Sequence, residues 1–123
     1  MMTETQQFIL EILEFIPVDE SVLIVQSPHE EVLSVLRIIV DNKKNDFETI
    51  KFSKKNRKIL IEEIKDNGIE EYIHRLEVLI KDKKVFEGYD GMEYAMFSKE
   101  FNLPKEFKEK YTKMDMCMIS EDW

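Results

Sequence analysis

The sequence predicts a single α+β domain in which an antiparallel sheet packs against three to four helices. Two patterns alternate along its 123 residues: apolar residues at helical spacing, and short β-branched runs that are typical of strands. No stretch has the composition of a linker, and the chain is long enough for one hydrophobic core. We therefore assign residues 1–123 to one domain.

The first half of the chain predicts two helices and two strands. "TETQQFILEILEFIP" predicts a helix that starts with a capping box of Thr3 and Gln6 and stops at a proline. "SVLIVQ" (21–26) is an apolar run typical of a buried strand. "SPHEEVLSVLRIIVDN" predicts a helix with Ser27 as N-cap, and the alternation in "FETIKF" (47–52) predicts the next strand.

The second half predicts two more helices and a meander of strands. "SKKNRKILIEEIKDNG" predicts a helix that begins after Ser53 and ends at Gly68. Residues 69–80 fit both a helix and a strand, and we choose a strand for their later part because a hairpin follows. "NLPKEFKEKY" predicts a short helix with Pro104 in its first position, and the alternation in "MDMCMIS" predicts a last strand.

The hairpin is centred on the dipeptide Asp90-Gly91, which favours a two-residue type I′ turn. That register places Tyr89 opposite Met92 and leaves Gly88 in mid-strand, as a bulge or a site of close approach. A second turn near residues 82–83 would place Ile80 opposite Val85. One apolar face, available to a layer of helices, would then carry Val78, Ile80, Val85, Tyr89, Met92, Tyr94 and Met96.

The charge of the chain restricts its partners. Acidic residues outnumber basic ones 26 to 18, which gives a net charge of −8, and ten acids and three bases fall within residues 1–50. Such a charge repels phosphate backbones and anionic lipids, so we expect no direct contact with nucleic acid or with a membrane. Basic protein surfaces remain suitable partners.

Several features predict a cytoplasmic protein. The single cysteine, Cys117, cannot form an intrachain disulfide, and no apolar run exceeds four residues. Runs this short provide neither a membrane span nor the apolar core of a signal peptide. The N-terminal "MMTETQQ" also contains no basic residue.

Three motifs could carry chemistry, and each also has a structural explanation. "GYDG" (88–91) could hold a phosphate, but the neighbouring acids favour a simple hairpin. "MDMCMIS" (114–120) offers soft ligands for copper(I), yet such methionines are also typical of a core or of an adaptable binding surface. Cys117 with His29 or His74 could pair a nucleophile with a base, but no activating motif surrounds this cysteine. We assign no catalytic, cofactor-binding or metal-binding residue.

The function that these features favour is binding of a basic protein. A small acidic domain can neutralise a basic enzyme, as immunity proteins neutralise bacterial nuclease toxins, because its carboxylates stand where substrate phosphates would lie. Aromatic side chains beside acids are suitable anchors for such a partner. The candidate contact residues are Asp19, Glu20, Glu30, Glu31, Tyr72, Tyr89, Tyr94 and Trp123.

Two alternatives belong to other classes of protein. The chain could be a small enzyme or a small-ligand module with a pocket of carboxylates and tyrosines, which would show as a deep pocket with a perturbed acid. It could also be an adaptor or a subunit of a larger complex. A toxin-like reading frame directly upstream would favour the immunity function over both.

Overall fold

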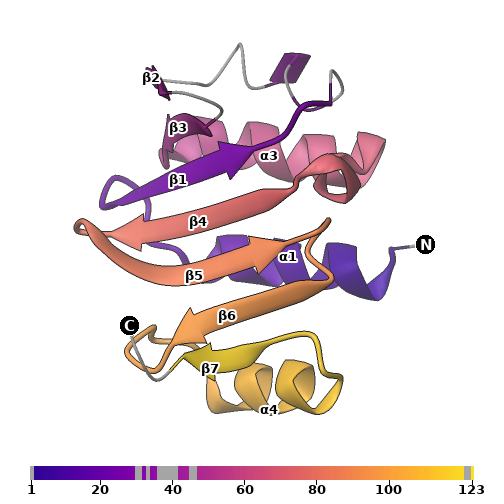
Figure 1. Cartoon of the computed structure of the whole chain (residues 1–123), viewed down its shortest axis with the longest axis vertical. Coiled ribbons are helices and arrows are strands. Elements are labelled where there is room, and N and C mark those ends of the chain that lie inside the picture. Colours follow the sequence, from indigo (N-terminus) through magenta and orange to yellow (C-terminus); the bar gives the residue numbers. More distant parts are fainter. Residues whose placement is uncertain (1, 30–31, 33, 36–41, 45–46, 121–122) are drawn as a thin grey trace.

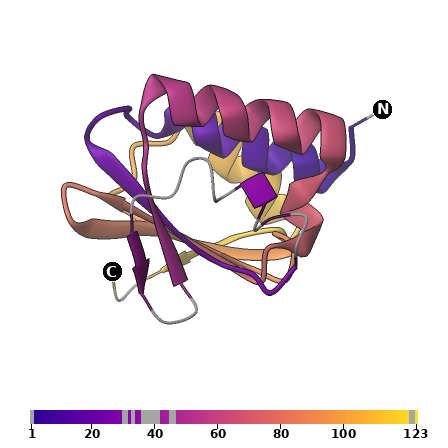
Figure 2. The same ribbon diagram turned by 90° about the horizontal axis from the view of Figure 1, so that it is seen from above.

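The computed structural model describes residues 2–29, 32, 34–35, 42–44, 47–120 and 123. These residues form two layers, a twisted sheet and a layer of helices that lies against one of its faces (Figure 1, Figure 2). The predicted α+β class, with a sheet packed against helices, is confirmed. Within the described residues, no helix is both long enough and apolar enough to cross a membrane.

Two helices begin and end at the residues that the sequence indicates. α1 (Glu4–Phe15) starts with the predicted capping box, in which the backbone N–H of Gln6 donates to Thr3 Oγ1 and the backbone N–H of Thr3 donates to Gln6 Oε1. α3 (Lys54–Asn67) starts after Ser53, whose hydroxyl accepts a hydrogen bond from a backbone N–H of the first turn. Gly68 ends α3 in the left-handed conformation, with φ of 60°.

The remaining helical segments differ in detail from the prediction. α4 (Lys105–Lys113) follows Pro104, which is the N-cap and not the first helical residue. The ambiguous segment 69–80 divides into the short 3₁₀ helix η1 (Ile69–Tyr72) and a strand, so the choice of a strand for its later part is confirmed. In the helix expected after Ser27, residues 32 and 34–35 are helical, and the rest of that segment lies outside the described residues.

The strand order across the sheet is β2-β3-β1-β4-β5-β6-β7. Neighbouring strands are antiparallel except β6 and β7, which run parallel because α4 lies between them in the chain. β4, β5 and β6 form the predicted C-terminal meander. The strands are β1 (Ser21–Gln26), β2 (Asn42–Lys44), β3 (Phe47–Lys51), β4 (Arg75–Ile80), β5 (Lys83–Tyr89), β6 (Tyr94–Ser98) and β7 (Met118–Ser120).

The hydrophobic core lies between the two layers. Phe8 of α1 is fully buried, and its ring centroid lies 6.0 Å from that of Phe86 in β5 and 4.8 Å from that of Tyr111 in α4. The Tyr111 hydroxyl also donates a hydrogen bond to Glu11, which joins α4 to α1. These contacts fix the helices on one face of the sheet and leave its other face without a helix in the described part of the chain (Figure 2).

The predicted register of the β5–β6 hairpin is wrong by two residues. Tyr89 pairs with Tyr94, and the connection is a four-residue loop from Asp90 to Glu93. A two-residue type I′ turn needs positive φ at its two central residues. In this loop three residues have positive φ: Asp90, Gly91 and Met92. The backbone N–H groups of Asp90 and Gly91 donate to the carbonyls of residues 74 and 73, at 2.9 and 2.8 Å. The loop is therefore held by the segment before β4.

The predicted apolar face is also wrong. Tyr94 and Met96 lie on the face away from the helices, because they alternate along β6 with the core residues Ala95 and Phe97. Tyr89 pairs with Tyr94 and shares that face. The turn between β4 and β5 is at residues 81–82, so Ile80 pairs with residue 83 and not with residue 85. A bulge beside Val78 and Leu79 then leaves residues 85 and 86 both buried.

The "MDMCMIS" segment does not alternate as predicted. The strand begins only at Met118, after a bend in which Asp115 has φ of 57°. Met116 and Cys117 are therefore both buried, whereas the Met118 side chain is 64% exposed. Met116 and Cys117 therefore belong to the core, whereas Met118 and Ile119 belong to the surface.

Candidate partner-binding face

The face of the sheet away from the helices is not covered by a helix in the described part of the chain, and we call it the open face. Directly paired residues of neighbouring strands project to the same face, so the strand pairings identify its members. In β1 and β3–β7 these members are Val22, Ile24, Gln26, Thr49, Lys51, Arg75, Glu77, Leu79, Lys84, Glu87, Tyr89, Tyr94, Met96, Ser98, Met118 and Ser120.

Two acids and two bases form an ion-pair network at the centre of the open face. Arg75 pairs with Glu87, and it also pairs with Glu77 at 2.8 Å. Lys84 lies 3.3 Å from Glu87 and 3.7 Å from Glu77. Because the charges balance, this network holds β4 and β5 together without adding net charge to the face.

Glu87 is an unusual member of this network because its side chain is only 5% exposed. Burial alone would raise the pKa of Glu87, but hydrogen bonds from Tyr89 and Lys84 and the charges of Lys84 and Arg75 hold it below its usual value. Glu87 is therefore ionised at neutral pH and serves as a fixed acceptor for the groups around it.

Tyr89 is held in place by the same network. Burial and the hydrogen bond to Glu87 raise the pKa of Tyr89 to about 12, so its hydroxyl stays protonated and donates. The Arg75 guanidinium lies 5.7 Å from the centroid of the Tyr89 ring. Tyr94, its pairing partner, is 62% exposed and projects from the same face. The sheet thus presents one fixed and one exposed tyrosine side by side.

Trp123 also belongs to this region. Its ring centroid lies 4.7 Å from the Lys84 ammonium, a cation–π contact that places the last residue of the chain over the network. Trp123 is of intermediate burial, so part of its side chain stays exposed. Together with Met118, the open face therefore carries a group of large aromatic and sulfur-containing side chains near β6 and β7.

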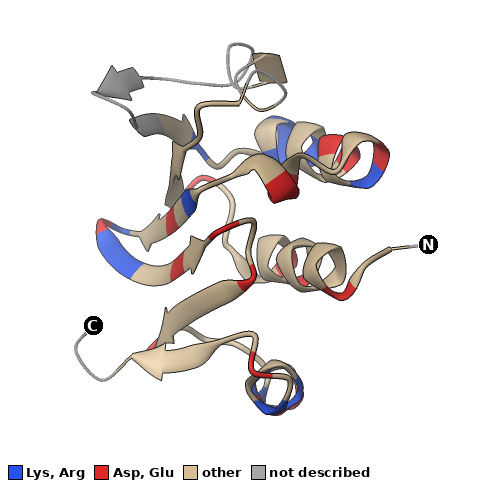
Figure 3. Cartoon of the chain, turned by 45° about the vertical axis from the view of Figure 1, so that its right-hand side comes forward, with Lys and Arg blue, Asp and Glu red and all other residues tan. Residues whose placement is uncertain are grey.

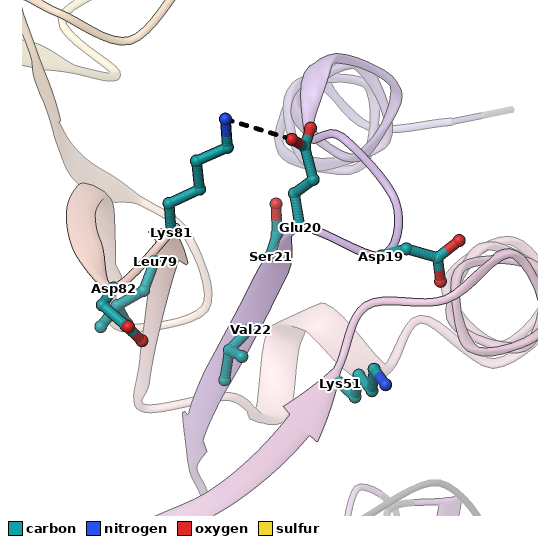
Figure 4. Close-up of a pocket in the computed structure, with 8 residues that line it drawn as sticks. All are labelled: Asp19, Glu20, Ser21, Val22, Lys51, Leu79, Lys81 and Asp82. Carbon is teal, nitrogen blue, oxygen red and sulfur yellow. Dashed lines mark ion pairs between the residues drawn. The ribbon is translucent and has the colours of Figure 1, made fainter.

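A hollow of about 480 Å³ lies at the end of the open face where β1 begins (Figure 4). Asp19 and Asp82 lie on opposite sides of it, and the side chain of Val22 lies between them (Figure 4). Glu20 pairs with Lys81 at 3.3 Å across its rim. The other lining residues are Ser21, Lys51 and Leu79.

Backbone contacts fix both acidic sides of this hollow. The N–H of Asp19 donates to the carbonyl of residue 52 at 2.7 Å, and the N–H of Lys81 donates to the carbonyl of Glu20 at 3.0 Å. Asp19 and Asp82 both have φ of 66°, a conformation that aspartate tolerates better than most residues. Within the described residues neither of these two carboxylates has an ion pair, so both can accept one from a partner.

The predicted contact residues are only partly brought together. Tyr89, Tyr94 and Trp123 gather on the open face, and Asp19 and Glu20 line the hollow at its end. The remaining three do not join them: the Tyr72 ring packs 5.2 Å from that of His29, beside η1, and Glu30 and Glu31 lie outside the described residues.

Sequence reasoning missed the ion-pair network and Asp82. The signal for the network was the alternation of charge in β4, where Arg75 and Glu77 are two residues apart and so project to one face. The apolar face that we predicted at this position leaves no place for ion pairs. Asp82 was assigned only a role in a turn.

The surroundings of Cys117, His29 and His74 do not support the nucleophile–base pair that the sequence could offer. Burial raises the pKa of Cys117 to about 11, which keeps its thiol protonated and a poor nucleophile at neutral pH. His29 and His74 contact each other, with ring centroids 5.5 Å apart. Within the described residues, no group of three or more His, Cys, Asp or Glu side chains could hold a metal ion.

The Gly88–Gly91 segment offers little to a phosphate. The backbone N–H groups of Asp90 and Gly91 already donate to backbone carbonyls. The small hollow beside the loop, of about 260 Å³, is lined by the acids Glu71, Asp90 and Glu93 together with Thr3, Thr5 and Gly91. Three carboxylates repel an anion, so the hairpin explanation of these glycines is the better one.

Comparison of this chain with protein-family models, with curated proteins and with solved structures found no match. The function must therefore be argued from the residues of the open face and its acidic hollow.

Proposed function

We propose that this chain is an intracellular, cytoplasmic binding protein that captures a basic protein on its open face, and that it neutralises that partner as an immunity protein neutralises a toxin. The single observation that carries the proposal is that one face carries both exposed anchors, in β6 and β7, and, at its end where β1 begins, acids that have no ion pair within the described residues. Tyr94 and Met118 are 62% and 64% exposed there, and Asp19 and Asp82 lie at its end.

The anchors are of the kinds that binding surfaces favour. Tyrosine, tryptophan, methionine and arginine are enriched in protein interfaces, where a few of them supply most of the binding energy. Tyr89 is already fixed by Glu87 and Arg75, so little conformational entropy is lost when a partner covers it. The nearby Trp123 adds a second large ring.

The acids supply the preference for a basic partner. The net charge is −8, and α1 carries Glu4, Glu11 and Glu14 without any basic residue (Figure 3). A lysine or arginine of the partner that enters the hollow would meet Asp19 and Asp82, which have no ion pair within the described residues. Opposite charge also speeds the encounter of two proteins.

The proposal is tested by capturing the partner from cells of the source organism with the tagged chain and then measuring affinity for the purified partner. Tyr94→Ala and Met118→Ala should each weaken binding by about fivefold or more, because truncation of an anchor costs at least about 1 kcal/mol. Met2→Ala is a matched control, since Met2 is also exposed, at 52%, but lies outside the sheet. If Tyr94→Ala and Met118→Ala bind the partner as tightly as the control Met2→Ala does, the open face is rejected as the binding surface.

An activity assay on the captured partner separates the immunity function from an adaptor function. If the partner is a basic enzyme, the wild-type chain should inhibit it at equimolar concentration, and Tyr94→Ala should require more protein for the same inhibition. A captured partner that keeps full activity in the complex would support the adaptor alternative.

A second candidate function is small-ligand binding in the hollow between Asp19 and Asp82. Its volume of about 480 Å³ lies within the range of known ligand pockets, about 300–1,000 Å³. The two acids would select a small organic cation. Asp82→Asn would then abolish binding of this cation, whereas Tyr94→Ala would leave its binding unchanged.

A further inference from the structure

His29 and His74 lie side by side on the surface, beyond the end of the open face that is opposite to the acidic hollow. Both side chains are exposed, and their rings meet edge to face, with centroids 5.5 Å apart and an interplanar angle of 77°. We propose that these two imidazoles form a binding site for a late first-row divalent cation, with Zn²⁺ as the cation we test. This site is independent of the partner-binding proposal.

The backbone around both histidines is fixed by hydrogen bonds. The N–H of His74 donates to the carbonyl of Gln26 at 2.9 Å, and the carbonyl of His74 accepts from the N–H of Asp90 at 2.9 Å. His74 is therefore held on one side by β1 and on the other by the β5–β6 loop. Its position does not depend on the metal.

His29 is tied to the same segment through Ser27. The Ser27 hydroxyl donates to the carbonyl of Tyr72, and Ser27 Oγ accepts from the N–H of His29 at 3.2 Å. The Tyr72 ring packs against the His29 ring, with centroids 5.2 Å apart. These contacts join the two histidine-bearing segments and hold them next to each other.

The separation of the rings suits coordination of a single ion. Zn²⁺ lies about 2.0–2.1 Å from each imidazole nitrogen, and a tetrahedral angle between two such ligands places the ring centroids about 5–6 Å apart. The observed 5.5 Å falls within this range. Imidazole nitrogen is a preferred ligand of zinc, copper and nickel, and because both rings are exposed, water can fill the remaining coordination positions.

The experiment is a calorimetric titration of the full chain with zinc chloride at neutral pH. We expect one equivalent of Zn²⁺ to bind, and we expect His29→Ala and His74→Ala each to weaken its affinity by about tenfold or more, since even loss of a second-shell partner costs about that much. Cys117→Ser is the matched control that removes the single thiol of the chain, which is buried, and it should bind as the wild type does. Thermal melting in chelator checks that the exposed histidine variants remain folded.

A measurement on the wild type keeps the inference falsifiable if a variant fails to fold. Paramagnetic Ni²⁺ should broaden the amide NMR signals of residues 26–29 and 72–75 before those of the rest of the chain. Broadening centred on the acidic hollow, absence of binding, histidine variants that bind as tightly as the wild type, or loss of binding in Cys117→Ser would each overturn the proposal.

Discussion

The sulfur of Met92 occupies the space in which a Cβ of Gly88 would lie, only 2.6 Å from that position. Gly88 is the last residue but one of β5, and Met92, in the loop that follows this strand, has no exposed surface. The glycine thus lets a loop side chain enter the core directly over a strand. This contact explains why a glycine stands at a position where glycine normally weakens a strand.

We predict that Gly88→Ala destabilises the protein. The added methyl group would overlap Met92 Sδ and would also meet Phe86 at 3.3 Å. Overpacking of this kind costs about 1–3 kcal/mol in the free energy of unfolding, which chemical denaturation measures.

A double-mutant cycle with Met92→Ala isolates the cause. Once the methionine side chain is removed, Gly88→Ala should cost much less than it does in the wild type, since the space is then free. Additive costs of the two changes would show that the contact with Met92 is not what requires glycine.

We also predict that Gly91→Val destabilises the protein, by about 1 kcal/mol or more, because a β-branched residue resists positive φ. Gly91 has φ of 68°, and a Cβ at this position would lie 3.1 Å from the carbonyl oxygen of Glu71. Thermal melting should show a lower midpoint for the variant.

Gly68 provides the comparison that separates backbone strain from crowding. It also has positive φ, but a Cβ there would meet only side-chain atoms, at 3.6 Å or more. Asparagine tolerates this conformation, so Gly68→Asn should be nearly neutral while Gly91→Asn still destabilises. Equal midpoints for the two asparagine variants would mean that the loop does not press against Glu71.

The helix boundaries could be predicted from sequence because their causes are local. The Thr3–Gln6 capping box, Ser53 and Gly68 all act within a few residues of the helix end that they set. The β5–β6 register could not be predicted from sequence, because it depends on hydrogen bonds from Asp90 and Gly91 to the segment before β4. Asp-Gly favours a tight turn, but these tertiary contacts select a longer loop.

Part of the candidate site was predicted correctly although the predicted register was wrong. A shift of two residues preserves which side chains share a face, so Tyr89, Tyr94 and Met96 still lie together as predicted. Which face the helices cover could not be inferred, because the bulge in β5 makes Val85 and Phe86 both buried and interrupts the alternation. The ion-pair network on the same face was missed for that reason.

The buried acid Glu70 leads to a prediction about pH. Glu70 is fully buried, its Oε2 has no hydrogen-bond partner within the described residues, and its Oε1 is 3.5 Å from Gln6 Nε2. Burial raises the pKa of Glu70 above its ordinary value. The folded state therefore binds this proton more tightly than the unfolded state does. The resulting stability is fully present below the unfolded pKa, about 4.3, and is lost as pH rises through the folded pKa.

Glu70→Gln should therefore raise the melting midpoint at neutral pH, because a neutral amide avoids the cost of burying a carboxylate whose ionised form the core disfavours. The gain should shrink as the pH falls toward about 4, because Glu70 is then itself protonated. Glu62→Gln, an exposed change on α3, should leave the midpoint nearly unchanged at both pH values. A Glu70→Gln variant that is less stable than the wild type at neutral pH would show that the carboxylate is stabilised by contacts we have not identified.

The last prediction concerns the rate at which the captured partner associates. If the acids of the hollow steer a basic partner, association must slow as salt rises, because exposed charges are screened beyond about 10 Å at 0.1 M ionic strength. Asp19→Lys and Glu20→Lys should lower the association rate more than they raise the dissociation rate, and both residues line the hollow. The same reversal at Glu30 and Glu31 tests the remaining N-terminal acids of the predicted set.

Glu62→Lys distinguishes local steering from net charge, since it makes the same change of charge on an exposed position of α3, in the helix layer. Stopped-flow kinetics at several salt concentrations should show a smaller effect for Glu62→Lys than for Asp19→Lys if the hollow meets the partner. An equal effect would mean that only the total charge attracts the partner, because total charge acts whatever the position of the residue. Association that is indifferent both to salt and to all of these reversals would reject electrostatic recognition, and with it the argument that the acids select a basic protein.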